Sequence, residues 1–173
     1  MKKYSVMLIS TFLFTFFLIG CASSVLLIRK PLETKLNQYS NFIFSAETSV
    51  AEDVNEEITD LEVTVINRVK GLNLFKSTEL GDGKNAKEGS LIIKAVITDI
   101  NKVSGTARFF LGAFAGKASM TIDVSFIDAK TGNSIGEFNI TGKSGGTGYA
   151  GGTSEAIEMT ADKIAEVISQ NYN

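Results

Sequence analysis

The sequence contains no histidine, no tryptophan, one cysteine and one proline among its 173 residues. Without histidine the chain cannot form a Ser-His-Asp or Cys-His catalytic arrangement, an imidazole metal site or a histidine proton shuttle. A single cysteine excludes an internal disulfide and a cysteine-rich zinc site. The remaining composition, 44% hydrophobic and 21% charged, is typical of a one-domain globular protein and too apolar for a disordered chain.

The N-terminal residues have the pattern of a bacterial export signal. Lys2 and Lys3 precede an uncharged, strongly apolar run that extends from Tyr4 to Ile19. The end of this run looks like a lipobox, the motif in which a cysteine is acylated before cleavage makes it the new N-terminus. The residues of the lipobox are Leu18, Ile19, Gly20 and Cys21. We therefore predict a lipoprotein signal peptide over 1–20 and lipidation of Cys21. An uncleaved signal anchor over 4–28 is the alternative.

Cleavage before Cys21 would leave 153 residues, in which 15 basic residues face 19 acidic ones, a net charge of −4. The chain has no basic cluster, so we expect no nucleic-acid partner. Acyl chains would hold the protein at the membrane, because two or more chains give stable anchoring. Ala22 stands where an aspartate usually signals inner-membrane retention. In an organism with two membranes, this favours the outer membrane, with the domain in the periplasm.

We predict three parts in the chain: the signal peptide over 1–20, a lipidated cysteine with a flexible tether over 21–38, and one domain over 39–173. The tether contains the apolar patch Val25–Ile28, which either docks as an extra strand or lies near the bilayer.

The domain shows two amphipathic helical patterns and several strand patterns. Apolar residues from Val54 to Leu72 recur at spacings of three and four, which predicts a helix with Asp53 as N-cap and Gly71 at its end. A second helix follows Thr153 or Ser154. The predicted strands are a short run at 42–44, then 72–77, 91–100, 117–128 and 134–141, the last two joined by a hairpin turn. We predict an α+β two-layer sandwich with a mostly antiparallel sheet of four to five strands and both helices on one face.

Two segments and the strand between them resemble one family. Residues 108–118, Arg-Phe-Phe-Leu-Gly-Ala-Phe-Ala-Gly-Lys-Ala, lead into an alternating strand that ends in Asp128-Ala129-Lys130-Thr131-Gly132. A glycine-rich segment over 145–152 then precedes the last helix. Together these residues resemble the bacterial lipoprotein family known as domain of unknown function 4410. The architecture is also similar to the periplasmic domain of the curli secretion channel lipoprotein. The family resemblance implies an α+β lipoprotein and no defined activity.

The first candidate functional segment is 108–117, eight uncharged residues between Arg108 and Lys117. A long apolar connection is unusual in water. It either folds back into the core or forms a tip that contacts a partner or dips into the membrane. It is too short to cross a bilayer as two strands. The residues assigned to this contact are Arg108, Phe109, Phe110, Leu111, Phe114 and Lys117.

The second candidate segment is 142–154, where Gly146 to Gly151 match the pattern G-x-G-x-x-G. A dinucleotide site needs a further parallel strand and an acidic residue about twenty positions on. The chain ends too soon for either, and Glu155 and Glu158 would repel a phosphate. We therefore expect no nucleotide and no other cofactor. Tyr149 is the one large side chain that could contact a partner.

No set of residues predicts a catalytic or metal site. We expect a lipid-anchored, non-enzymatic envelope protein that contacts a partner, or assembles a complex, through the two segments. The alternative is a homo-oligomeric assembly or secretion component that resembles the curli channel lipoprotein. An envelope hydrolase or a ligand carrier is the least favoured interpretation.

Overall fold

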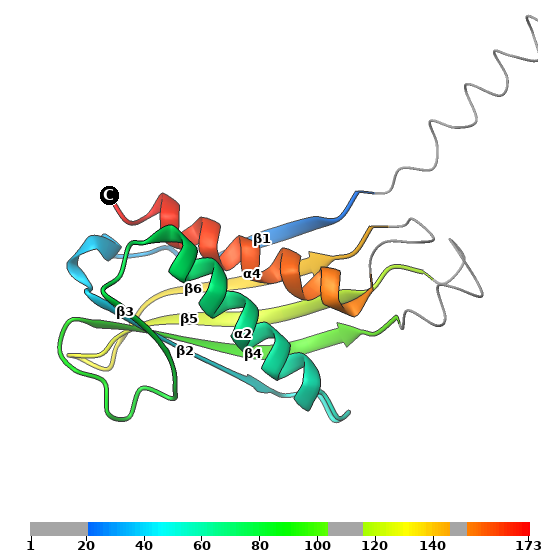
Figure 1. Ribbon diagram of the computed structural model, residues 1–173, viewed down its shortest axis with the longest axis horizontal. Coiled ribbons are helices and arrows are strands. Elements are labelled where there is room, and N and C mark those ends of the chain that lie inside the picture. Colours follow the sequence, from blue (N-terminus) through cyan, green and yellow to red (C-terminus); the bar gives the residue numbers. More distant parts are fainter. Residues whose placement is uncertain (1–20, 104–115, 146–151) are drawn as a thin grey trace, which may run out of the picture.

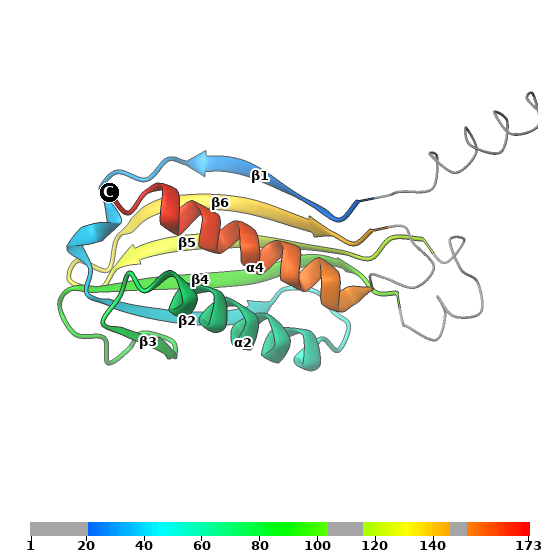
Figure 2. The ribbon, with the colours of Figure 1, turned by 45° about the horizontal axis from the view of Figure 1, so that its top comes forward.

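The computed structural model describes residues 21–103, 116–145 and 152–173. Within these residues, one six-stranded sheet carries two long helices on one face (Figures 1 and 2). The strands are β1 (Ser23–Lys30), β2 (Asn41–Thr48), β3 (Ser77–Leu80), β4 (Ser90–Asn101), β5 (Ser119–Asp128) and β6 (Ser134–Lys143). The helices are α2 (Asn55–Leu72) and α4 (Thr153–Gln170), with a short 3-10 turn, η2, at Leu36–Gln38. No described helix is both long and apolar enough to cross a membrane.

The strand order in the sheet is β1-β6-β5-β4-β2-β3. The pairs β1–β6, β6–β5 and β5–β4 are antiparallel, whereas β2 is parallel to both β4 and β3. The parallel pair β2–β3 is connected through α2, as a parallel pair requires a crossover. The predicted α+β class with two helices is confirmed. The prediction of four to five strands is close but not exact, because the additional strand β1 brings the sheet to six.

The two-layer description is close but incomplete. Both helices cover the same face, and the buried alternate residues of β5, from Met120 to Phe126, point toward them. On the opposite face, the connection between β3 and β4 packs against the sheet. A Cβ on Gly83 would lie 2.6 Å from Cδ1 of Ile92, whose side chain is only 7% exposed. The connection between β3 and β4 therefore covers a small part of the sheet face that lies opposite the helices.

The predicted flexible tether is wrong for residues 23–38. Residues 23–30 form β1, which runs antiparallel to β6 in the register Leu26↔Ile140. The connection that follows is also fixed, since the N–H of Glu33 donates to Ile135 at 2.9 Å and Leu36 is fully buried. The apolar patch Val25–Ile28 thus docks as an extra strand, because the edge of β6 would otherwise remain unpaired. The ordered domain begins near Ser23 and not near Tyr39.

The predicted apolar face of α2 is confirmed, since Leu61, Val65 and Val69 are buried against the sheet. The predicted ends of the helix differ from the observed ones. Val54 occupies the N-cap position, while the Asp53 carboxylate accepts from the N–H of Asn55 at 3.2 Å. The helix continues to Leu72 because Asn73 adopts the left-handed conformation, with φ 54°, that ends it.

The predicted strand at 72–77 is also displaced. β3 begins at Ser77, which pairs with Asn41 of β2. The preceding residues bring the chain back from the helix layer to the sheet, and the ring of Phe75 packs 5.4 Å from that of Phe42. The apolar residues at 72–75 therefore pack against the core as a connection.

Candidate interaction site at the loop end

Several segments that are far apart in sequence begin or end at the same end of the sheet. The register aligns Ser23 with Lys143, Lys143 with Ser119, and Ser119 with Asn101. We call this the loop end and define it by residues 21–24, 101–103, 116–119, 143–145 and 152–155. Both candidate segments leave the described structure here (Figure 1). Cys21 lies at the same end, two residues before Ser23, which pairs with Lys143.

Hydrogen bonds connect the bases of the two candidate segments. The N–H of Ala118 donates to Oγ of Ser144 at 2.9 Å, and the N–H of Ser144 donates to the carbonyl of Ala118, also at 2.9 Å. The N–H of Val103 donates to Oγ1 of Thr153 at 3.3 Å, so the end of β4 contacts the start of α4. These bonds give the connections β4–β5 and β6–α4 a shared, rigid base.

The start of α4 is held by interactions that the sequence pattern did not indicate. Gly152 is its N-cap, with φ 144°, and no side chain caps the helix. The predicted capping residue Thr153 instead accepts the bond from Val103. The Glu155 carboxylate accepts from the N–H of Gly145 at 2.7 Å, which ties the first turn of α4 to the end of β6. The predicted cap, Thr153 or Ser154, is therefore wrong, because Gly152 is the N-cap and both predicted residues lie inside the helix.

A hollow of about 640 Å³ opens beside the loop end, between the first turns of α2 and α4. Most of its charged lining is acidic: Glu56, Glu57, Asp60, Glu155 and Glu158. Lys102 is the basic member of that lining. Its Nζ lies 2.9 Å from Glu57, and it donates to the carbonyl of Asp53 at 2.7 Å. The hydrogen bond that Lys102 donates to the Glu57 carboxylate raises the pKa of Lys102 above its ordinary value.

The chemistry of this hollow does not indicate a metal centre or an anion site. In the described parts of the chain, no group of three or more Cys, Asp or Glu residues is arranged to hold a metal ion. Glu56 and Asp60 are exposed on α2, as expected for a solvated helix face. Acidic side chains at both helix starts disfavour a phosphate ligand. The hollow can offer carboxylate acceptors to a polar or basic surface.

The structure places only two of the predicted site residues. Cys21 is exposed, two residues before β1, and Lys117 is exposed beside the start of β5. The carbonyl of Lys117 accepts from Nδ2 of Asn101 at 3.0 Å, which fixes the base of the first segment. The other predicted residues lie outside the described residues: Leu18, Ile19, Gly20, Arg108, Phe109, Phe110, Leu111, Phe114 and Tyr149.

Sequence reasoning did not identify the residues that join the two segments. Ser144 and Gly145 lie in the second candidate segment directly after β6, but no local pattern indicates which residues they bond. The sequence predicted that Val25–Ile28 either docks as an extra strand or lies near the bilayer, but it did not predict that a docked strand would keep exposed apolar side chains. Val25, Leu27 and Ile28 are 55%, 59% and 56% exposed. The uninterrupted apolar run Val25–Ile28 was the available signal, since a run of this kind left uncovered is unusual.

Comparison with known proteins gives a family and a fold. The model of DUF4410, a domain of unknown function, matches residues 28–151. No curated protein matches the chain.

The fold is similar to that of PelC from Paraburkholderia phytofirmans, which forms a dodecamer in its crystals. The TM-score is 0.57 at 10% identity, over 84% of this chain and 96% of PelC. A second PelC dodecamer, of a single-substitution variant, gives a TM-score of 0.55 at 10% identity, over 83% and 96% of the two chains. A DUF330 protein from Xanthomonas campestris gives 0.44 at 8% identity, over 88% and 94%.

Proposed function

The chain belongs to the DUF4410 family, and from this premise we propose that it is a lipid-anchored, non-enzymatic interaction module of the bacterial envelope. Acyl chains on Cys21 would attach it to the membrane. The domain would then act by contact with another envelope protein. In an organism with two membranes, it would be held at the outer membrane and face the periplasm.

The observation that carries this proposal is the convergence at the loop end. Cys21 lies two residues before Ser23, which pairs with Lys143 at the base of the second segment. Lys143 also pairs with Ser119, next to the base of the first segment. An anchor at Cys21 would therefore hold both candidate segments close to the membrane surface. A partner located in or near that membrane would meet these segments first.

The absence of enzymatic activity is part of the proposal and is supported by composition. The chain has no histidine and one cysteine, and that cysteine is assigned to the anchor. The hollow beside the loop end is lined mostly by carboxylates, and one of these, Glu57, already pairs with Lys102. These residues supply a polar contact surface and no evident nucleophile with its base.

Self-association is a second candidate function, and the likeness to PelC favours it. PelC is a dodecamer, and its fold covers most of this chain. At 10% identity the likeness is one of fold, so oligomerisation of this chain is an inference from it. A homo-oligomer of anchored copies could serve in assembly or secretion, which is the function that the resemblance to the curli channel lipoprotein implies.

The native mass of the acylated protein, extracted from its own envelope in mild detergent, tests both candidates. A small particle that contains one other polypeptide supports the interaction module, and the second polypeptide identifies its partner. A large homogeneous particle of this chain alone supports self-association. A monomer without a partner, at several detergent concentrations, would contradict both.

A further inference from the structure

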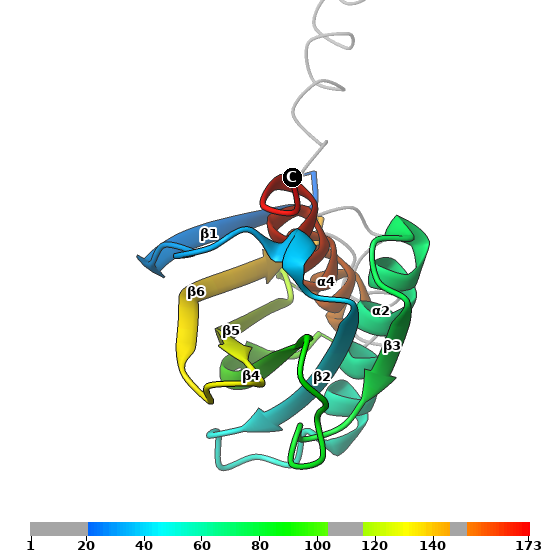
Figure 3. The same ribbon diagram turned by 90° about the vertical axis from the view of Figure 1, so that its left-hand side faces the viewer.

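We propose that copies of this chain associate head to tail, with the β1 flank of one copy against the β3–α2 flank of the next. The β1 flank is the free edge of β1 over Val25–Lys30. The β3–α2 flank comprises β3 and the exposed side of α2. These flanks lie on opposite sides of the domain (Figure 3). The inference rests on the second candidate function, self-association, and identifies the surfaces that would carry it.

Exposed apolar side chains mark these two flanks. In the described part of the chain, the large apolar residues that are most exposed are Val25, Leu27, Ile28, Val63 and Leu80. The first three belong to β1, whereas Val63 belongs to α2 and Leu80 to β3. Leu27 is 59% exposed and Leu80 is 50% exposed. Each flank therefore has apolar surface that a neighbouring copy could bury.

The two flanks also carry opposite charge. Val25–Lys30 contain two basic residues, Arg29 and Lys30, and no acid, a net charge of +2. Arg29 pairs with Asp123 at 2.9 Å and Lys30 with Glu33 at 3.0 Å, which compensates part of this charge. The elements α2 and β3 together contain five acidic and two basic residues, a net charge of −3. Unlike flanks attract and like flanks repel, which favours contact between a β1 flank and a β3–α2 flank.

Anchoring selects the same arrangement. Copies anchored through Cys21 in one membrane must present their loop ends to that membrane. Two β1 strands paired antiparallel would reverse one copy and separate the anchors. Head-to-tail contact avoids this, because a rotation about an axis along the strands keeps every loop end on one side. Since β1 runs opposite to β3 within one copy, β1 of one copy then lies antiparallel to β3 of the next. Repeated contacts of this type close into a ring when the rotation between neighbours divides a full turn.

The contact is expected to use side chains rather than extend the sheet along all of β2. β3 pairs with β2 only from Asn41 to Phe44. Beyond it, Oε1 of Glu62 on α2 accepts from the N–H of Ala46 at 2.9 Å. This carboxylate occupies the backbone donor that an incoming strand would need. The apolar residues Leu80 and Val63 lie on the same flank and remain available.

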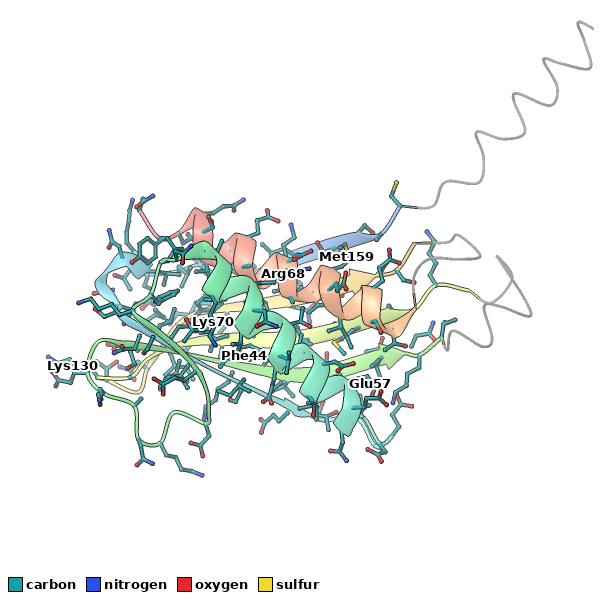
Figure 4. The ribbon with its side chains drawn as sticks, in the orientation of Figure 1. Phe44, Glu57, Arg68, Lys70, Lys130 and Met159 are labelled. Carbon is teal, nitrogen blue, oxygen red and sulfur yellow. The ribbon has the colours of Figure 1, made fainter. Side chains whose placement is uncertain are left out.

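Introduced cysteines test the proposal directly, because Cys21 is the only cysteine of the chain and its thiol would carry an acyl chain. The variants are Leu27→Cys, Leu80→Cys and the double variant, each expressed as the full chain in its own envelope and oxidised there. We expect the double variant to give a ladder of cross-linked multimers. Each single variant alone should give none, and the two single variants co-expressed should give a dimer only. The control is a double variant that combines Leu27→Cys with Lys130→Cys. Lys130 lies at the end of the sheet opposite to the loop end (Figure 4), so this variant should give no ladder.

The other outcomes overturn the proposal in distinguishable ways. A dimer from Leu27→Cys alone would mean that two β1 flanks meet. A large native particle without any ladder would mean that self-association is correct and the assigned flanks are wrong. A particle of one copy with another polypeptide, again without a ladder, would contradict both self-association and the flanks.

Discussion

Ser144 and Ala118 form a reciprocal pair at the loop end, in which the Ser144 hydroxyl accepts the N–H of Ala118 and the Ser144 N–H donates to the carbonyl of Ala118. Both residues are fully buried. The pair lies just beyond the last register pair of β5 and β6, Ser119↔Lys143. It therefore closes the sheet at the point where the first candidate segment ends and the second begins.

The variant Ser144→Ala is expected to destabilise the domain by about 1–3 kcal/mol, because it leaves the buried N–H of Ala118 without its hydroxyl acceptor. Urea unfolding measures this loss. Ser125→Ala, on the partly exposed face of β5, is the control and should change stability by about 0.5 kcal/mol or less. An unchanged free energy of unfolding for Ser144→Ala would show that the pair does not hold the loop end.

Gly142 allows α4 to approach β6 closely, and we expect Gly142→Ala to destabilise the domain by at least about 1–3 kcal/mol. A Cβ at this position would lie 2.2 Å from the carbonyl oxygen of Ala156 and 2.8 Å from the N of Thr160. These are backbone atoms of α4 and cannot move without displacing the helix. Thermal unfolding of the variant gives the measurement.

Gly71→Ala is the matched control for this substitution. Gly71 lies in the last turn of α2, and a Cβ there would have no heavy atom within 4 Å. Alanine should stabilise the helix by about 0.5–1 kcal/mol because it has less backbone freedom to lose on folding. Equal effects from the two substitutions would contradict the close approach at Gly142.

The parts of the fold that could be predicted are those with a local pattern. β5 alternates between buried and half-exposed residues, and α2 carries an apolar stripe, so each reveals its period in the sequence. β1 has no such period, because Val25–Ile28 are apolar without interruption. Its identity as a strand depends on the free edge of β6, more than a hundred residues away in sequence.

The candidate site, like the fold, could be predicted from the sequence only in part. The apolar and glycine-rich compositions marked the two segments, since both are unusual for connections. Their convergence depends on the register between β4, β5 and β6, which no local pattern encodes. Similarly, no sequence pattern indicates that the Glu155 carboxylate accepts a hydrogen bond from the N–H of Gly145.

Alkaline pH is expected to destabilise the domain through Tyr39, which is 5% exposed. Burial, with a smaller contribution from the Asp128 carboxylate, raises the pKa of Tyr39 above its ordinary value. Above a pH of about 10, tyrosine in the unfolded chain loses its proton while folded Tyr39 keeps it. The unfolded state then binds fewer protons, so stability falls as the pH rises toward the pKa of the folded state.

Tyr39→Phe should remove this part of the alkaline loss. Urea unfolding of both proteins from pH 8 to 11 provides the comparison, since this range brackets the ordinary tyrosine pKa of about 10. The difference in stability between wild type and variant should shift in favour of the variant only above that pKa. A difference that does not depend on pH would show that the ionisation of Tyr39 is not coupled to folding.

Phe110→Asp tests whether the first candidate segment contacts a partner or belongs to the core. If the segment forms a contact, the variant should lose the complex seen by native mass, while its free energy of unfolding changes by about 0.5 kcal/mol or less. If the segment is core, the free energy of unfolding of the variant should instead fall by an amount comparable to a core loss. Phe126→Ala is the reference for a core loss, about 3–5 kcal/mol, because Phe126 is fully buried and packs 5.2 Å from the ring of Phe138.

Cys21→Ser is expected to release the protein from the membrane, because the hydroxyl does not provide the thiol to which the acyl chains attach. Fractionation of membranes from soluble envelope contents measures the distribution, and labelling with a radioactive fatty acid measures acylation. Ser23→Ala, two residues further on, leaves the thiol intact and should remain in the membrane fraction. Retention of Cys21→Ser in the membrane without acylation would favour the uncleaved anchor over 4–28. Because β1 occupies Ser23–Lys30, that anchor would have to end before Ser23 and not at residue 28, and the loop end would still lie next to the membrane.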